Sequence, residues 1–169
     1  MDTKCLLIGF MGVGKTTIAK LLAKELATSY IDLDEKIVET TKMPINDYFN
    51  VYGEKAFRNY ETQMLQYYLG IKPIIATGGG IVTSSKNRQL LKTNCPIIYL
   101  KADTETLLKR ITTDSLTLRP LIINKTEEEI NELVEYRRSF YEELADLTIK
   151  TDEKTPNQIT QKILANLKK

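Results

Sequence analysis

Histidine and tryptophan are both absent from this 169-residue sequence. Without histidine, the chain cannot build a His-containing metal site, a Ser-His-Asp triad or a histidine acid–base shuttle. Apolar runs are also short, and none approaches the roughly 18 residues of a membrane span. The opening segment MDTKCLLIGF lacks the architecture of a signal peptide. We therefore expect a soluble, cytoplasmic protein with no membrane partner.

Cysteine is scarce, and neither sign of charge dominates. Cys5 and Cys95 lie at the edges of apolar runs and match no metal-ligand or redox spacing, so we expect buried free thiols in a reducing compartment. Twenty-four basic and 22 acidic residues leave a net charge of +2, which argues against a nucleic-acid partner. The length suits a single domain, residues 1–169, with a sizeable core.

Short apolar runs alternate along the chain with longer amphipathic stretches. The runs predict strands at 5–10, 30–34, 73–77, 96–100 and 147–150. Between them apolar residues recur at helical spacing, and a last helix is expected from near Pro156. Because these runs are apolar rather than strictly alternating, they indicate a parallel sheet covered on both faces. The expected fold class is α/β, with three layers in the order α/β/α and five parallel strands.

Two stretches interrupt this alternation. Residues 34–72 carry a helical pattern that is too long for one crossover, and residues 111–125 are mostly polar, contain a proline and have no steady period. Insertions of this kind on an α/β core often form a substrate-binding region and a mobile lid. An ordinary surface loop remains the alternative for each stretch.

A phosphate-binding loop follows the first expected strand. The segment GFMGVGKT at 9–16 fits the pattern G-x-x-x-x-G-K-[ST], between an apolar strand and an amphipathic helix. Its backbone N–H groups and the helix N-terminus favour a bound phosphate. We expect Lys15 to reach the β- and γ-phosphates and the Thr16 hydroxyl to bind Mg²⁺. The residues expected to bind the nucleoside triphosphate here are Gly12, Val13, Gly14, Lys15, Thr16 and Thr17.

The segment NKTE at 124–127 is one residue away from the N-K-x-D motif that reads guanine in GTPases. Glu127 stands in place of the aspartate, and the chain has no D-x-x-G switch motif. Thr126 followed by three glutamates is typical of a helix N-cap with acidic residues in the first turn. We therefore interpret this segment as the start of a helix.

Two aspartates end the second expected strand. Asp32 and Asp34 are separated by one residue, and a period of two would place both carboxylates on the same side of the strand. Ligands of open α/β sheets bind beyond such strand ends. One carboxylate would then face Mg²⁺ and the other an acceptor hydroxyl. The alternative is that Asp34 only caps the helix that begins at DEKIVET.

Three consecutive glycines follow the third expected strand, in the segment TGGG at 77–80. Such a run is costly in chain entropy, so it indicates a close approach of the backbone to a ligand. The plausible ligand beside a phosphate-binding loop is a substrate. A simple tight turn is the alternative.

Two arginines are expected to point inward from helices. Arg137 falls on the apolar stripe of its helix, whereas Arg138 falls on the polar face. Arg58 lies within i+3 reach of Glu61, which would hold its guanidinium. Two inward arginines suggest a second ligand that is an anion such as a carboxylate. Two structural salt bridges remain the alternative.

These motifs resemble, in their combination and order, those of the shikimate kinase family. The matching segments are GFMGVGKTT, DLD, FxxxGExxFRxxE from Phe49 to Glu61, TGGG, LRPL, and RxxxYxxxAD from Arg137 to Asp146. The resemblance runs from Lys4 to about Pro156, and motif order and chain length both fit. It differs at Ser139, where the family commonly has proline, and at the pair Tyr48-Phe49.

The resemblance implies a P-loop kinase that transfers the γ-phosphoryl group of ATP to the 3-hydroxyl of shikimate, in aromatic amino-acid biosynthesis. It implies the strand order 2-3-1-4-5, one Mg²⁺ ion and a monomer. Asp34 would bind the shikimate hydroxyls and act as the base or orienter, and Asp32 would lie near Mg²⁺ through water. The remaining implied contacts are Arg58 and Arg137 on the shikimate carboxylate, Gly79 and Gly80 on the ring, Arg110 on adenine and the lid residue Arg119 on the phosphates.

Two alternatives remain at this point. One is another small-metabolite kinase of the same fold, such as a gluconate kinase. The other is a nucleotide-binding regulatory module that holds ATP without consuming it. The TGGG segment together with DLD and the paired arginines argues against the first, and intact acceptor-site residues argue against the second.

Overall fold

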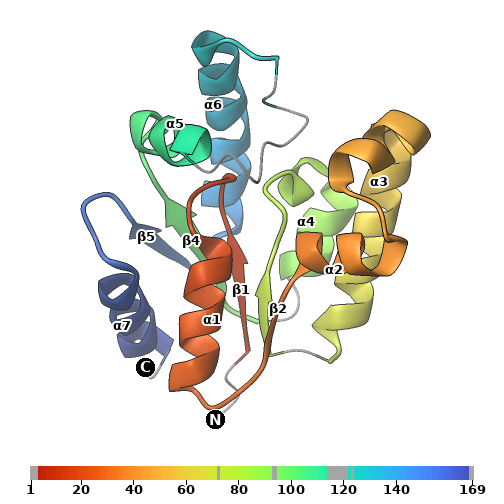
Figure 1. Ribbon diagram of the computed structural model, residues 1–169. Helices are drawn as coiled ribbons and strands as arrows, with labels where there is room; N and C mark the ends of the chain where they lie inside the picture. The colour runs from red at the N-terminus through yellow and green to blue at the C-terminus, as the bar shows by residue number, and fades with distance from the viewer. Residues whose placement is uncertain (1–3, 72, 93–94, 114–121, 123, 168–169) are drawn as a thin grey trace.

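The computed structural model describes residues 4–71, 73–92, 95–113, 122 and 124–167. Its centre is one five-stranded parallel sheet in the order β2-β3-β1-β4-β5 (Figure 1). This confirms both the α/β class and the strand order. The strands are β1 Cys5–Ile8, β2 Tyr30–Asp32, β3 Ile74–Ala76, β4 Ile97–Lys101 and β5 Leu147–Lys150.

The three central strands β1, β3 and β4 form much of the core, whereas the edge strand β5 is largely exposed. All of β1 and β3 is buried, and β4 is buried up to its last residue. Four of the expected strands begin or end one or two residues outside the observed ones; in β1, β2 and β3 the chain turns away at the carboxyl edge to build loops. Those loops at the ends of β1, β2 and β3 are where the functional residues gather.

Helices cover both faces of the sheet. In Figure 1, α1 lies in front of the sheet beside α7, while α4 and α6 lie behind it. No helix in the described part of the chain is long and apolar enough to cross a membrane. The helices are α1 Lys15–Glu25, α2 Leu33–Thr41, α3 Ile45–Leu69, α4 Ser85–Lys92, α5 Thr104–Thr113, α6 Glu127–Leu144 and α7 Pro156–Leu167, with a short 3₁₀ turn η1 at Ile81–Thr83.

The start of α6 confirms the interpretation of the NKTE segment. Thr126 is the N-cap, and its hydroxyl accepts a hydrogen bond from the Glu129 backbone N–H at 3.2 Å. The Glu129 carboxylate accepts in return from the Thr126 N–H at 2.7 Å, which completes a capping box. This threonine and the following glutamates therefore begin a helix.

Helix α3 bends sharply at Gly53, where the backbone has φ 81° and ψ 166°. A side chain at this backbone conformation would be strained, so glycine suits the bend. The bend folds the first part of α3 back toward the second, and the ring centroids of Phe49 and Phe57 lie 4.7 Å apart. Residues 34–69 thus form a folded helical arm at one side of the sheet (Figure 1).

Candidate active site

Two adjoining pockets open at the carboxyl edge of the sheet. The first, called here the P-loop pocket, is lined by residues that include Lys15, Thr16 and Asp32. The second, called here the arginine pocket, is lined by residues that include Arg58 and Arg137. Met11 lines both pockets. Two ligands bound in them would therefore lie next to each other.

The phosphate-binding loop lines its pocket as the motif predicts. Gly12, Gly14, Thr16 and Thr17 line the cavity, whereas the Val13 side chain is 2% exposed and packs in the core. The Lys15 ammonium donates hydrogen bonds to the loop carbonyls of Gly9 at 2.7 Å and Phe10 at 2.9 Å.

These two bonds hold the Lys15 ammonium against the loop, within the same cavity as the Thr16 hydroxyl. Its positive charge is therefore available to phosphate oxygens that enter the P-loop pocket.

Thr16 and Asp32 meet inside the P-loop pocket. The Thr16 hydroxyl donates a hydrogen bond to one Asp32 carboxylate oxygen. The other oxygen accepts from the backbone N–H groups of Asp34 at 2.9 Å and Glu35 at 3.2 Å, so Asp32 caps α2. Burial, and then the nearby Asp34, raise the pKa of Asp32.

This pair of oxygen donors fits Mg²⁺. Among the described residues, no group of three or more carboxylates, thiols and imidazoles could hold a metal ion by itself. Mg²⁺ commonly uses only one or two protein ligands, with water and substrate phosphates completing its shell. The hydroxyl of Thr16 and the buried carboxylate of Asp32 are the groups that would hold it.

Asp34 is placed differently from the sequence expectation. The strand ends at Asp32 and Asp34 is the second residue of α2, so the two carboxylates do not share one side of a strand. The helix is capped by Asp32, which corrects the alternative that Asp34 is the cap. The helical turn directs Asp34 into the arginine pocket, while Asp32 lines the P-loop pocket.

Arg58 is held in the arginine pocket by Glu61. A guanidinium nitrogen lies 2.9 Å from a Glu61 carboxylate oxygen, as the i+3 spacing predicts, and another lies 3.5 Å from Glu54. The guanidinium also lies near two aromatic rings, 6.0 Å from the Phe49 centroid and 5.3 Å from the Phe57 centroid. Glu61 is 1% exposed, and burial raises its pKa to about 7 although Arg58 lowers it.

Arg137 enters the same pocket from α6, as its place on the apolar stripe predicts. It is 2% exposed, and desolvation lowers its pKa. Its guanidinium lies 5.5 Å from the Phe10 ring centroid, and within the described residues its Nε and Nη1 atoms have no hydrogen-bond partner. Arg138 does not line this pocket; it is half-buried and forms an ion pair with Glu135 at 3.0 Å.

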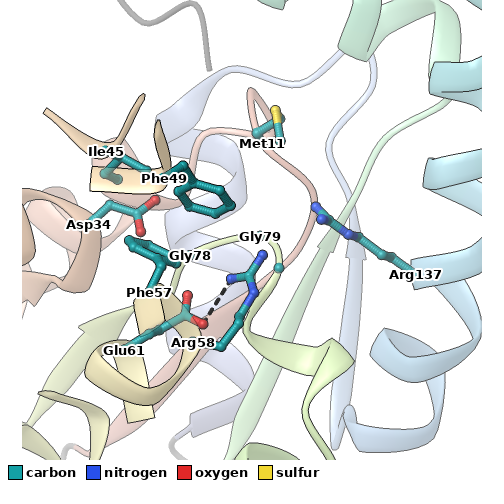
Figure 2. A pocket seen from close by; sticks show the side chains of 11 residues that line it. Met11, Asp34, Ile45, Phe49, Phe57, Arg58, Glu61, Gly78, Gly79 and Arg137 are labelled. Carbon is teal, nitrogen blue, oxygen red and sulfur yellow. Dashed lines mark hydrogen bonds and ion pairs between the residues drawn. The ribbon is translucent and has the colours of Figure 1, made fainter. Parts of the chain in front are cut away.

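Figure 2 shows Arg58 reaching into the pocket from below and Arg137 from the right, with Asp34 and Phe49 on the left. A buried cation with unused donors is costly unless an anion meets it. The pocket therefore has the charge and the donors to bind an anion between the two arginines.

The glycine loop after β3 forms the floor of the arginine pocket. Gly78, Gly79 and Gly80 are all buried and line it. A Cβ on Gly78 would stand 2.7 Å from an Asp34 carboxylate oxygen. The Gly79 carbonyl accepts a hydrogen bond of 2.5 Å from the Tyr141 hydroxyl, which fixes the orientation of the following peptide. The run of glycines thus lets the carboxylates of Asp34 and Glu61 approach the backbone at Gly78, and the guanidinium of Arg58 approach it at Gly80.

Four predicted residues remain to be placed. Arg110 lines the P-loop pocket, where its guanidinium donates to the Val13 carbonyl at 3.4 Å and the Thr151 hydroxyl at 3.3 Å. Arg119 and most of the expected lid at 111–125 lie outside the described residues. Cys5 is buried as expected, whereas Cys95 is only half-buried, and within the described residues the two are not joined by a disulfide.

Ile45 lines the arginine pocket but gave no signal in the sequence. Met11 and Phe49 also line it; they lie in the matching segments GFMGVGKTT and FxxxGExxFRxxE, which did not assign them a contact. Tyr141 lies in the matching segment RxxxYxxxAD, also without an assigned contact. Its bond to Gly79 joins residues 62 positions apart, which no local pattern reveals.

Known proteins with similar sequences identify the family of this chain. A family model described as shikimate kinase matches residues 11–168 of the chain. A shikimate kinase of Enterococcus faecalis is 48% identical over 162 residues, which cover 96% of this chain and 96% of that protein. The chain belongs to the shikimate kinase family. It therefore has the activity of that family, an ATP-dependent phosphotransferase activity.

Other relatives of the shikimate kinase family agree. One from Streptococcus gordonii is 44% identical over 157 residues, covering 92% of this chain and 95% of that protein. The solved structure of the Acinetobacter baumannii shikimate kinase in complex with shikimate has a TM-score of 0.91 at 34% identity, covering 97% of this chain and 92% of that chain. Membership in this family favours shikimate kinase activity over gluconate kinase activity.

Proposed function

We propose that this chain transfers the γ-phosphoryl group of ATP to the 3-hydroxyl of shikimate, as part of aromatic amino-acid biosynthesis. The observation that carries this proposal is the buried Arg137, which lines the same pocket as Arg58 and Asp34 and whose Nε and Nη1 atoms have no hydrogen-bond partner among the described residues. A ligand of this pocket needs a carboxylate for the arginines and a hydroxyl for the aspartate. Shikimate has both.

The two arginines would bind the shikimate carboxylate. Arg58 is oriented by Glu61, and Arg137 is oriented by its burial beside Phe10. Planar guanidinium groups suit a carboxylate because they can donate two parallel hydrogen bonds. The backbone of Gly79 and Gly80 would approach the ring from the floor of the pocket.

Asp34 would align the attacking hydroxyl. Its carboxylate lies near Gly78 at the wall of the arginine pocket, and it either accepts the hydroxyl proton or only orients the oxygen. Phosphoryl transfer has a loose transition state, so alignment and charge stabilisation contribute more than proton abstraction. Lys15 would supply positive charge from the P-loop pocket, and Arg119 would do so from the lid at 111–125.

Thr16 and Asp32 would hold Mg²⁺, with Asp32 acting through water. When bound, this ion neutralises charge on the β- and γ-phosphates. The side chains keep their oxygens oriented for it because Thr16 donates to Asp32 and Asp32 is fixed at the start of α2. Arg110 would lie against adenine at the outer side of the P-loop pocket.

We further propose that the chain acts as a cytoplasmic monomer and a single domain. Residues 34–72 would bind shikimate, and residues 111–125 would close over the nucleotide and exclude water. The only ligands required are ATP, Mg²⁺ and shikimate, with no nucleic acid.

Product analysis tests the proposal. The protein is incubated with ATP, Mg²⁺ and shikimate, and the product is examined by NMR for phosphorus coupling to the ring protons. We expect coupling to the proton at carbon 3 alone. Coupling to another ring proton would contradict the proposed orientation, and the absence of a phosphorylated product would contradict the proposed reaction.

A further inference from the structure

Helix α4 does not line the arginine pocket, but it contacts the two helices that carry the arginines. One of its residues contacts α3, which carries Arg58, and the next contacts α6, which carries Arg137. Asn87 is fully buried, which is unusual for an amide side chain in a short helix. Its Nδ2 donates to the Ile81 carbonyl at 3.2 Å, and its Oδ1 accepts from the Thr62 hydroxyl at 2.7 Å. Asn87 therefore joins the turn that follows the glycine loop to helix α3.

The α3 end of this connection lies beside the first arginine. Thr62 directly follows Glu61, and its hydroxyl lies 2.8 Å from the carbonyl oxygen of Arg58. The Ile81 end directly follows Gly80, which lines the pocket. Asn87 thus connects the backbone around Arg58 to the floor of the arginine pocket.

Arg88 makes the corresponding connection to the second wall. Its guanidinium donates to the carbonyls of Val82 at 2.7 Å and Thr83 at 3.2 Å, which are the last two residues of η1. It also lies 4.4 Å from the ring centroid of Phe140, on α6. Phe140 is three residues beyond Arg137, so it is one helical turn away on the same helix.

We propose that Asn87 and Arg88 are positioning residues that set the separation of Arg58 and Arg137. Both residues donate hydrogen bonds to carbonyls of the same short turn, η1. Asn87 also contacts α3, which carries Arg58, and Arg88 also contacts α6, which carries Arg137. A carboxylate between two guanidinium groups demands a separation that is correct to a fraction of an ångström. This proposal rests on the proposed role of the two arginines.

The effect of Asn87 and Arg88 is expected on shikimate and not on ATP. Neither residue lines either pocket, so neither touches a substrate. The helices they connect carry the arginines, whereas the P-loop and α1 lie outside this set of contacts. A change in the arginine separation should therefore raise KM for shikimate and leave KM for ATP unchanged.

Paired variants test the proposal, because replacing the buried Asn87 itself risks loss of folding. Thr62→Val removes the donor to Asn87, and Thr62→Ser keeps it. Arg88→Met removes the bonds to η1, and Arg88→Lys keeps a cation that can donate to one carbonyl. We expect about a tenfold rise in KM for shikimate in Thr62→Val and Arg88→Met, with recovery in Thr62→Ser and partial recovery in Arg88→Lys.

Two control variants separate positioning from general destabilisation. Thr160→Val removes another buried hydroxyl, in α7, and Arg138→Met removes another half-buried arginine, on α6. The proposal holds if Thr62→Val and Arg88→Met raise KM for shikimate while the controls, with a similar fall in melting temperature, leave that KM unchanged. An equal change of KM for ATP and shikimate in the test variants, or no change in either, would overturn it.

Arg137→Met is measured in the same assay to separate the two proposals. If it fails to raise KM for shikimate, the role of the arginines is wrong and the positioning proposal falls with it. If it raises KM while Thr62→Val and Arg88→Met do not, only the positioning role of α4 is wrong.

Discussion

The guanidinium of Arg58 lies directly against the backbone of Gly80. A Cβ placed on Gly80 would stand 2.2 Å from the Nη2 atom of Arg58 and 2.7 Å from its Cζ atom. Gly80 has φ −88° and ψ −2°, a conformation that any residue can adopt. Glycine is therefore required here for the space it leaves to Arg58, and the backbone itself would accept alanine.

Gly80→Ala is expected to separate function from stability. The added methyl group would displace the end of the flexible Arg58 side chain, so the melting temperature should change little. KM for shikimate should rise about tenfold, because a charge-assisted hydrogen bond to the carboxylate is lost. Gly70→Ala is the control, since the nearest atom to its Cβ would be 3.8 Å away. A large loss of stability in Gly80→Ala alone would contradict this explanation.

Asp34→Asn should lower turnover and leave ATP binding nearly intact. The change removes a carboxylate from the arginine pocket and alters little volume, while the P-loop pocket is lined by other residues. We expect kcat to fall about 100-fold or more. Steady-state kinetics and an ATP titration provide the measurement. A loss of ATP affinity with unchanged kcat would exclude the proposed role of Asp34.

Arg137→Lys should weaken shikimate binding far more than Arg138→Lys does. Arg137 is buried in the pocket, whereas Arg138 pairs with Glu135 outside it. Lysine keeps the charge but loses the planar fork, so we expect about a tenfold or greater loss of affinity at position 137 only. Calorimetric titration with shikimate measures both variants. Equal losses would show that the helix face does not determine the role.

Glu61 should make stability depend on pH in a defined direction. Burial raises its pKa from 4.5 to about 7, so the folded protein binds this proton more tightly than the unfolded chain does. Its contribution to stability is therefore full below about pH 4.5, decreases as pH rises toward about 7 and is constant above.

Denaturant unfolding of the wild type and Glu61→Gln at pH 5 and pH 8 tests this direction. The stability of the wild type relative to Glu61→Gln should be lower at pH 8, by an amount on the order of 3 kcal/mol. The reverse sign would mean that the Arg58 ion pair outweighs desolvation.

Thr16→Val should raise the Mg²⁺ concentration needed for half-maximal activity. The variant removes the hydroxyl that donates to Asp32, and with it one expected oxygen ligand. We expect a rise of about tenfold or more, and near-normal behaviour for Thr16→Ser. A magnesium titration after chelation measures the effect. The same Mg²⁺ requirement in all three proteins would exclude Thr16 as a ligand.

Much of the fold was predictable because its signals are local. Apolar runs of strand length locate β1 to β5, and the acidic turn after Thr126 locates the start of α6. The bend at Gly53 was not predicted, because one glycine in a helical pattern does not reveal a positive φ. The strand order came from the resemblance to the shikimate kinase family, since no local pattern specifies which strands are neighbours.

The candidate site was predictable where a motif or a helix face carried it. The phosphate-binding loop is contiguous, and the i+3 spacing sufficed to pair Arg58 with Glu61. The placement of Asp34 was wrong in detail because the chain changes from strand to helix after Asp32, which replaces a period of two with one of 3.6. The contact between Tyr141 and Gly79 depends on how α6 packs, so only the structure reveals it.

The most direct test of this account is ADP release from ATP and Mg²⁺, measured with shikimate, with gluconate, with AMP and with no acceptor. Two pockets that meet at Met11, one of them with paired arginines, predict release that depends on shikimate alone. Release with no acceptor preference, or none at all despite ATP binding, would contradict it and leave only a nucleotide-binding protein.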